Sequence, residues 1–150
     1  MLKSMIVLTI CLSVLSVAGG LSANTTGEFQ VIVHATNPSA SLTKTELARM
    51  FLKKLTTWKK NNDLVYPVDL QKDSLVRIQF SQDILGKKVA AIKAYWQQQI
   101  FAGREIPPME KASDEEVLKY VEQQTGAIGY VSRSTDIRKY QVKVIEILEE

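Results

Sequence analysis

The fold is decided by residues 65–80, VYPVDLQKDSLVRIQF. The first residues of this stretch form an apolar run of strand type, a polar loop follows, and apolar residues then return at helical spacing. We therefore predict a strand that leads into the N-terminus of a helix. Free N–H groups and the helix macrodipole make such an end attractive to anions, and Asp73 or Ser74 is of a type that caps it. A helix cap without any ligand explains the same residues.

Residues 1–23 have the order of features that is typical of a secretory signal peptide. Lys3 supplies a positive charge, residues 5–17 are mostly apolar, and small residues follow up to Ala23. The apolar run is shorter than the roughly 20 residues of a membrane span, so an uncleaved anchor is the weaker alternative. We expect cleavage between about Gly19 and Asn24, no acyl chain, and a periplasmic or secreted mature protein.

Cysteine content and charge exclude several classes of function. Cys11 is the only cysteine and lies in the predicted signal segment, so we expect no disulfide, thiol nucleophile or thiolate metal site in the mature protein. Without Lys3, the 19 Lys and Arg residues become 18 against 16 Asp and Glu, and the net charge falls from +3 to +2. This balance argues against a nucleic-acid partner. A membrane partner is expected only through an uncleaved signal segment.

Residues 24–150 are enough for one domain with its own core. Capping boxes at Thr43–Glu46 and Ser113–Glu116 each predict a helix. Strand patterns occupy residues 29–35, 65–70, 126–131 and 142–148, and further helical patterns occupy residues 75–86 and 88–101. In the helix predicted at residues 88–101, the apolar residues expected to face inward are Val89, Ile92, Tyr95, Trp96 and Ile100. Since strands and helices alternate, the sequence predicts an α/β sheet.

Short motifs throughout the domain resemble one known family. They are Asn37-Pro38, Leu42-Thr43, Glu46-Leu47, Met50-Phe51, Trp58, Tyr95-Trp96, Phe101-Ala102-Gly103, Pro107-Pro108, Ser113-Asp114 and the Gly-Ala-Ile-Gly-Tyr-Val strand at 126–131. This pattern resembles the periplasmic phosphate-binding proteins of ABC transporters, and in particular their short, single-lobe members. The similarity runs from about Val31 to Leu148. It implies one lobe of a type II periplasmic binding protein, with a mixed sheet flanked by helices.

The resemblance also implies a set of ligand-binding residues. In full-length members, phosphate lies between two lobes, and the second lobe holds it with an arginine and a Ser-Gly-Thr at a helix N-terminus. The Ser-Gly-Thr falls on residues 74–76, where only the serine matches, and the arginine falls near Leu70 and is absent. Asp69, next to Leu70, would repel a fully ionised oxyanion. Only a protonated oxyanion could donate a hydrogen bond to its carboxylate. The candidate ligand-binding residues are Asp69, Ser74, Leu75, Val76 and Arg77.

Other chemistries find little support in the sequence. His34 is the only histidine and has no nearby carboxylate or cysteine cluster, so we interpret it as structural or as a surface residue. Trp58 and Trp96 are expected to pack in the core or in a cleft wall rather than to stack on a ligand. Gly126 and Gly129 are explained by a tight turn and close strand packing. We therefore expect no catalytic residues, no metal site, no cofactor and no enzymatic activity.

Two functions from different classes remain. The first is an exported solute-binding domain that captures phosphate or a related oxyanion for an ABC-type uptake system, with a partner lobe or a second copy. Its partners would be the anion and a transporter permease. The second is an interaction or scaffold module that docks on another envelope protein and has lost small-ligand binding.

Overall fold

The computed structural model describes residues 28–149. The predicted signal segment, residues 1–23, and its predicted cleavage site lie outside the described residues. The described chain forms eleven elements in the order β1 (Phe29–His34), β2 (Ser41–Thr43), α1 (Lys44–Phe51), β3 (Tyr66–Leu70), α2 (Leu75–Asp83), α3 (Val89–Phe101), β4 (Met109–Lys111), α4 (Asp114–Gln123), β5 (Ala127–Ser132), β6 (Val142–Val144) and β7 (Glu146–Leu148). The predicted α/β alternation is therefore confirmed.

The main sheet has five strands in the order β4-β3-β5-β1-β6 and is mixed. Strand β3 pairs in parallel with β4 on one side and with β5 on the other. Strand β1 pairs antiparallel with both β5 and β6. Strands β2 and β7 form a separate parallel pair. The predicted mixed sheet flanked by helices is confirmed.

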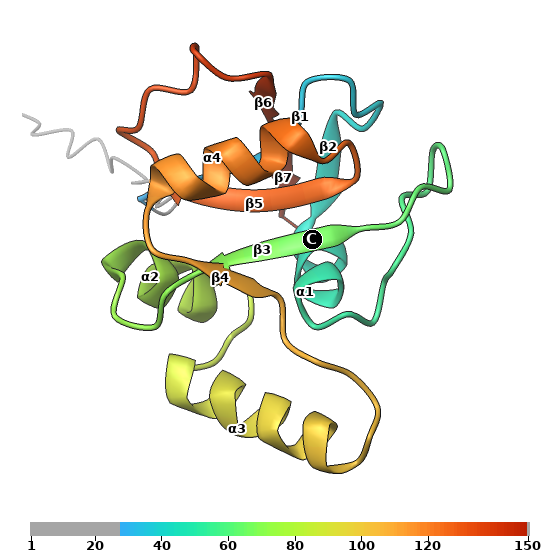
Figure 1. The fold of residues 1–150 in the computed structure, drawn as a ribbon, viewed down its shortest axis with the longest axis vertical. Coiled ribbons are helices and arrows are strands. Elements are labelled where there is room, and N and C mark those ends of the chain that lie inside the picture. The colour runs from blue at the N-terminus through green and yellow to red at the C-terminus, as the bar shows by residue number, and fades with distance from the viewer. Residues whose placement is uncertain (1–27, 150) are drawn as a thin grey trace, which may run out of the picture.

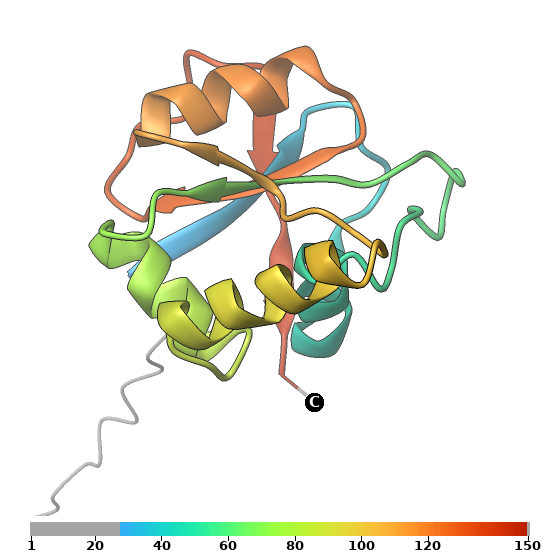
Figure 2. The same ribbon diagram turned by 60° about the horizontal axis from the view of Figure 1, so that its bottom comes forward.

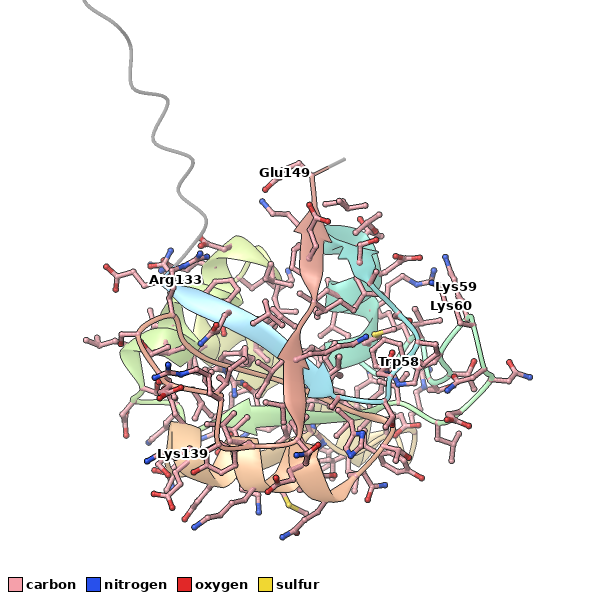
Figure 3. All side chains as sticks on the ribbon, turned by 90° about the horizontal axis from the view of Figure 1, so that it is seen from above. Trp58, Lys59, Lys60, Arg133, Lys139 and Glu149 are labelled. Atoms are coloured by element: carbon pink, nitrogen blue, oxygen red, sulfur yellow. The ribbon has the colours of Figure 1, made fainter. Side chains whose placement is uncertain are left out.

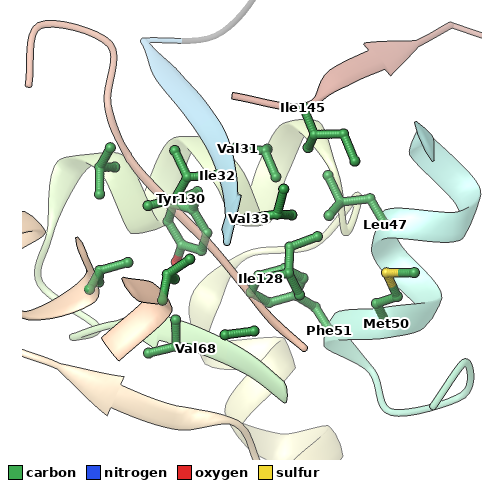
Figure 4. Packing of buried hydrophobic residues seen from close by; sticks show 14 of the residues in the cluster. Val31, Ile32, Val33, Leu47, Met50, Phe51, Val68, Ile128, Tyr130 and Ile145 are labelled. Atoms are coloured by element: carbon green, nitrogen blue, oxygen red, sulfur yellow. The ribbon is translucent and has the colours of Figure 1, made fainter. Parts of the chain in front are cut away.

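Helices cover both faces of the sheet. Figure 1 shows α4 on one face and α1 and α2 on the other, while α3 lies outside α2. Between these layers lies one core, in which α1 contributes Leu47, Met50 and Phe51. Figure 4 shows Leu47 and Phe51 directed towards residues of β1 and β5, such as Val33 and Ile128. The sheet and its two helical layers thus form a single hydrophobic core.

Local sequence features explain where the helices begin. Thr43 and Glu46 form the predicted capping box at α1, because each side chain bonds to the backbone N–H of the other. At α4, Ser113 accepts the N–H of Glu116, but the Glu116 carboxylate bonds to the N–H of Ala112 instead of Ser113. The second predicted capping box is therefore only half formed.

Close packing explains the two glycines of the predicted 126–131 strand. A Cβ atom on Gly129 would lie 2.8 Å from methyl groups of Val117 and Val68, and one on Gly126 would lie 2.1 Å from the Leu64 carbonyl oxygen. These distances leave no room for a side chain, so α4 approaches β5 as closely as it does because residue 129 is glycine. The predicted close packing is confirmed.

Some predicted elements need correction. The pattern at 142–148 is not one strand but two, because the buried Ile145 separates β6 in the main sheet from β7 in the small sheet. Strand β2 was not predicted, since three residues are too few to show a period. In α3, Ile92 and Trp96 are buried as predicted, but Ile100 is 53% exposed because the end of the helix projects beyond the core.

Candidate functional site

A pocket of about 600 Å³ lies where β3 ends and α2 begins. One side of it is formed by the β3–α2 segment, and the other by α3 and the chain that leads from α3 into β4. Figure 2 shows α3 running beside α2, with that chain returning to the sheet. The lining residues are Asp69, Lys72, Asp73, Arg77, Val89, Ala90, Lys93, Trp96, Pro107, Pro108 and Glu110. Residues 65–80, the stretch that decides the fold, therefore also form one side of the pocket.

Asp69 and Arg77 form a buried ion pair at the base of this pocket. The distance between Arg77 Nη1 and Asp69 Oδ2 is 2.5 Å, and the two side chains are only 5% and 4% exposed. Arg77 also donates to the Leu70 carbonyl at 2.8 Å and, through Nε, to the Ser81 hydroxyl at 3.2 Å. Most of the guanidinium's hydrogen-bonding capacity is thus used inside the protein.

The Asp69 carboxylate has two further donors. It accepts the backbone N–H of Leu70 at 3.1 Å and the hydroxyl of the buried Tyr130. The Tyr130 ring in turn stacks on Phe80 of α2, with ring centroids 3.8 Å apart. Because strand side chains alternate, Asp69 faces α2 while its neighbour Val68 faces α4. The network therefore joins the sheet to the helix that follows it.

Burial dominates the ionisation of this network. It raises the pKa of Asp69 from 3.8 to about 6, although Arg77 and the Tyr130 hydroxyl act in the opposite direction. The pKa of the Tyr130 phenol is also raised, first by burial and then by the neighbouring Asp69 carboxylate. Glu110 lies on the rim, with a carboxylate oxygen 3.9 Å from Arg77 Nη1. Arg77 therefore faces two carboxylates of the protein itself, those of Asp69 and Glu110.

The start of α2 lies next to the pocket. Ser74 is the N-cap residue, and its hydroxyl accepts the backbone N–H of Arg77 at 3.3 Å. The predicted cap is therefore confirmed. Leu75 is 80% exposed, and Val76 packs partly against the core. By helical geometry the N–H groups of Leu75 and Val76 have no partner within the helix, and they remain available to water or to an anion.

The structure thus divides the five candidate residues. Asp69 and Arg77 line the pocket, while Ser74, Leu75 and Val76 form the adjacent first turn of α2. Sequence reasoning missed the opposite wall, which α3 and residues 107–110 contribute. Its visible signals were the motif Pro107-Pro108 and Trp96, which was predicted to lie in the core or a cleft wall. Lys93 gave no such signal, because nothing in a single helix pattern shows what a polar residue faces.

Two cationic residues of the pocket stand apart from the buried pair. Lys72 lies in the β3–α2 loop and Lys93 on α3, and both are exposed. Neither forms an ion pair with any residue between 28 and 149. Their ammonium groups are therefore the positive charges that the pocket offers to a ligand.

Trp58 and His34, which the sequence analysis also considered, form contacts within the fold. The Trp58 indole N–H donates to the Gly126 carbonyl at 3.0 Å, and the side chain is 1% exposed. Figure 3 shows Lys59 and Lys60 at the outer rim of the molecule next to it. His34 forms a hydrogen bond with the Thr36 hydroxyl at 2.8 Å.

Within the described part of the chain, no group of three or more His, Cys, Asp and Glu residues has the arrangement of a metal site. None of the helices described is both long and apolar enough to cross a membrane.

The comparisons with known proteins agree with this architecture. Residues 25–146 match the family described as the PBP superfamily domain, and the chain belongs to that family. No curated protein matches the chain.

Similar solved structures come from several bacteria. A Clostridium perfringens protein described as a phosphate ABC transporter substrate-binding protein, solved with bound phosphate, has 21% identity and a TM-score of 0.61. An ABC-type phosphate transport receptor from Vibrio cholerae has 22% identity and a TM-score of 0.61. PstS from Borrelia burgdorferi has 13% identity and a TM-score of 0.63. Each comparison covers 80% of this chain but only 44%, 46% and 47% of the other, respectively. The chain thus spans less than half of these structures and shares the fold of that part.

Proposed function

We propose that this chain is an exported solute-binding module that holds phosphate or a related oxyanion in the pocket at the end of β3, for an ABC-type uptake system. The observation that carries the proposal is the position of this pocket. It lies at the carboxyl end of a strand with parallel neighbours and beside a helix N-terminus, the place where α/β proteins bind anionic ligands. Family membership supports a solute-binding role.

The contacts available in the pocket indicate weak binding of a simple anion. Lys72 and Lys93 offer ammonium groups and the first turn of α2 adjoins the pocket, but Arg77 is already paired with Asp69. Charge-assisted hydrogen bonds contribute about 1.5–3 kcal/mol each before the ordering costs of binding. Two or three of them correspond to a dissociation constant on the order of millimolar. A second lobe or a second copy would be needed for tight binding.

Thermal unfolding of the purified protein tests this function. Phosphate at ten times its dissociation constant should raise the free energy of unfolding by about 1.4 kcal/mol, beyond the effect of chloride at equal ionic strength. Lys72→Ala should reduce that increase. Lys139→Ala is the matched control, because Lys139 lies on the β5–β6 loop and does not line the pocket. If phosphate acted no differently from chloride, the proposal would be wrong.

One observation favours a second candidate, an interaction module of the cell envelope. The Asp69 carboxylate occupies Arg77 in the way that a bound anion would, so the strongest anion-binding side chain of the pocket serves the fold. A lobe that has lost its ligand would retain a site of this kind, in which the arginine is paired with a carboxylate of the protein itself. Under this alternative, phosphate leaves the unfolding transition unchanged, and crosslinking in intact cells joins the chain to a permease or another envelope protein.

A further inference from the structure

We infer that the pocket takes an organic oxyanion, a phosphate ester or phosphonate with an apolar body, and that inorganic phosphate occupies only its charged end. This inference rests on the proposed function, because it specifies the ligand class of the same site. It follows from the size of the pocket, the chemistry of its two walls and its balance of charges.

The pocket is too large for a simple ion. Its volume of about 600 Å³ lies within the range of roughly 300–1,000 Å³ that is usual for sites of organic ligands. A single tetrahedral oxyanion fills a small part of this space and leaves the remainder to water. An ion held in that way keeps much of its hydration and gains little from enclosure.

The wall that faces the β3–α2 segment is largely apolar, and Lys93 and Glu110 are its charged residues. Its apolar residues are Val89, Ala90 and Trp96 from α3, followed by Pro107 and Pro108. Trp96 is 5% exposed and Pro108 is buried, so the surrounding structure holds this wall in place. Proline has no N–H, and the side chains of Val89 and Ala90 offer no donors to an oxyanion, so the Trp96 indole is the one donor among these five side chains. A surface of this kind binds the carbon skeleton of a ligand.

The charges of the lining nearly cancel. Lys72, Arg77 and Lys93 are balanced by Asp69, Asp73 and Glu110, which gives three positive and three negative groups. A compact multivalent anion therefore meets no strong positive field. Selective binding needs a second source of free energy, and the apolar wall supplies it through burial of the ligand's apolar surface.

The position of Ala90 allows this inference to be tested without disturbing the core. Ala90 is exposed on the first turn of α3 and lines the pocket, whereas its neighbour Ala91 is exposed but does not line it. Ala90→Leu should fill the apolar end of the pocket. Ala91→Leu introduces the same side chain into the same helix and serves as the matched control.

Calorimetric titration with phenyl phosphate, inorganic phosphate and phenol decides the matter. We expect phenyl phosphate to bind at least tenfold more tightly than inorganic phosphate. Ala90→Leu should abolish this advantage without weakening inorganic phosphate, and Ala91→Leu should preserve it. Tryptophan fluorescence provides a second readout, since Trp96 lines the pocket while Trp58 is buried beside Gly126. Phenyl phosphate should change the emission of the wild type and change it less in Ala90→Leu.

The remaining outcomes separate the inference from the proposed function. Equal constants for phenyl phosphate and inorganic phosphate would overturn the inference and leave the proposed function intact. Phenol binding as tightly as phenyl phosphate would also overturn it, because the ligand would then need no oxyanion. If neither phosphate compound bound to protein with a native circular dichroism spectrum, both the inference and the proposed function would be wrong.

Discussion

Asp69 and Arg77 have a structural role that their place in the candidate site does not reveal. Both are almost fully buried, and together with Tyr130 they connect β3, α2 and β5. Removing a charge from water is costly, and a buried pair offsets this cost only when both partners are present and hydrogen-bonded. The pair is therefore sensitive to the loss of either member.

Arg77→Met is expected to lower the free energy of unfolding by about 3–5 kcal/mol, because it leaves the Asp69 carboxylate buried without its cation. Urea denaturation measures this difference. The double variant Asp69→Leu with Arg77→Met removes both charges and should recover most of the loss. A loss below about 1 kcal/mol in the single variant would contradict a buried, mutually dependent pair.

The pKa of Asp69 gives a second prediction at the residue scale. Because burial raises it from 3.8 to about 6, the folded protein binds this proton more tightly than the unfolded chain does. The contribution of Asp69 to stability should be complete below about pH 4 and should be lost as the pH rises through about 6. Carboxyl ¹³C NMR should show a titration near pH 6, and a midpoint below 4 would contradict the prediction.

At the scale of elements, the junction of β3 and α2 was the part most readily predicted from sequence. The polar loop at 71–74 and the serine at its end define a cap by short-range chemistry alone, and Ser74 is indeed the N-cap residue. The β6 and β7 strands were predicted as one because their alternation continues through Ile145. Only a change of tertiary partner separates them, because the Ile145 N–H still donates to the Val31 carbonyl of β1 whereas β7 pairs with β2.

Ser74→Ala should lower the free energy of unfolding by about 1 kcal/mol, since it removes the hydroxyl that accepts the Arg77 N–H. Chemical denaturation measures the change. Ser113→Ala, which removes the equivalent cap of α4, is the matched control and should have a similar effect. A much larger loss at Ser74 than at Ser113 would show that Ser74 does more than cap its helix.

At the scale of the whole molecule, half of the pocket was predictable and half was not. Residues 69–77 adjoin one another in sequence, so their shared position follows from a strand and a helix. Lys93, Trp96 and Glu110 reach the same pocket only because α3 packs against α2 and β4 returns to pair with β3. No local pattern records those contacts. The chain also spans less than half of the similar solved structures.

Calorimetry with inorganic phosphate tests the central claim most directly, using the purified wild-type protein and the Lys72→Ala, Lys93→Ala double variant. We expect a dissociation constant on the order of millimolar for the wild type, because only a few charge-assisted donors are free. The double variant should bind at least tenfold more weakly, since it removes both unpaired ammonium groups, whereas Lys139→Ala should match the wild type. Phosphate that released no more heat than chloride, or that bound equally well to the double variant, would contradict an oxyanion site in this pocket.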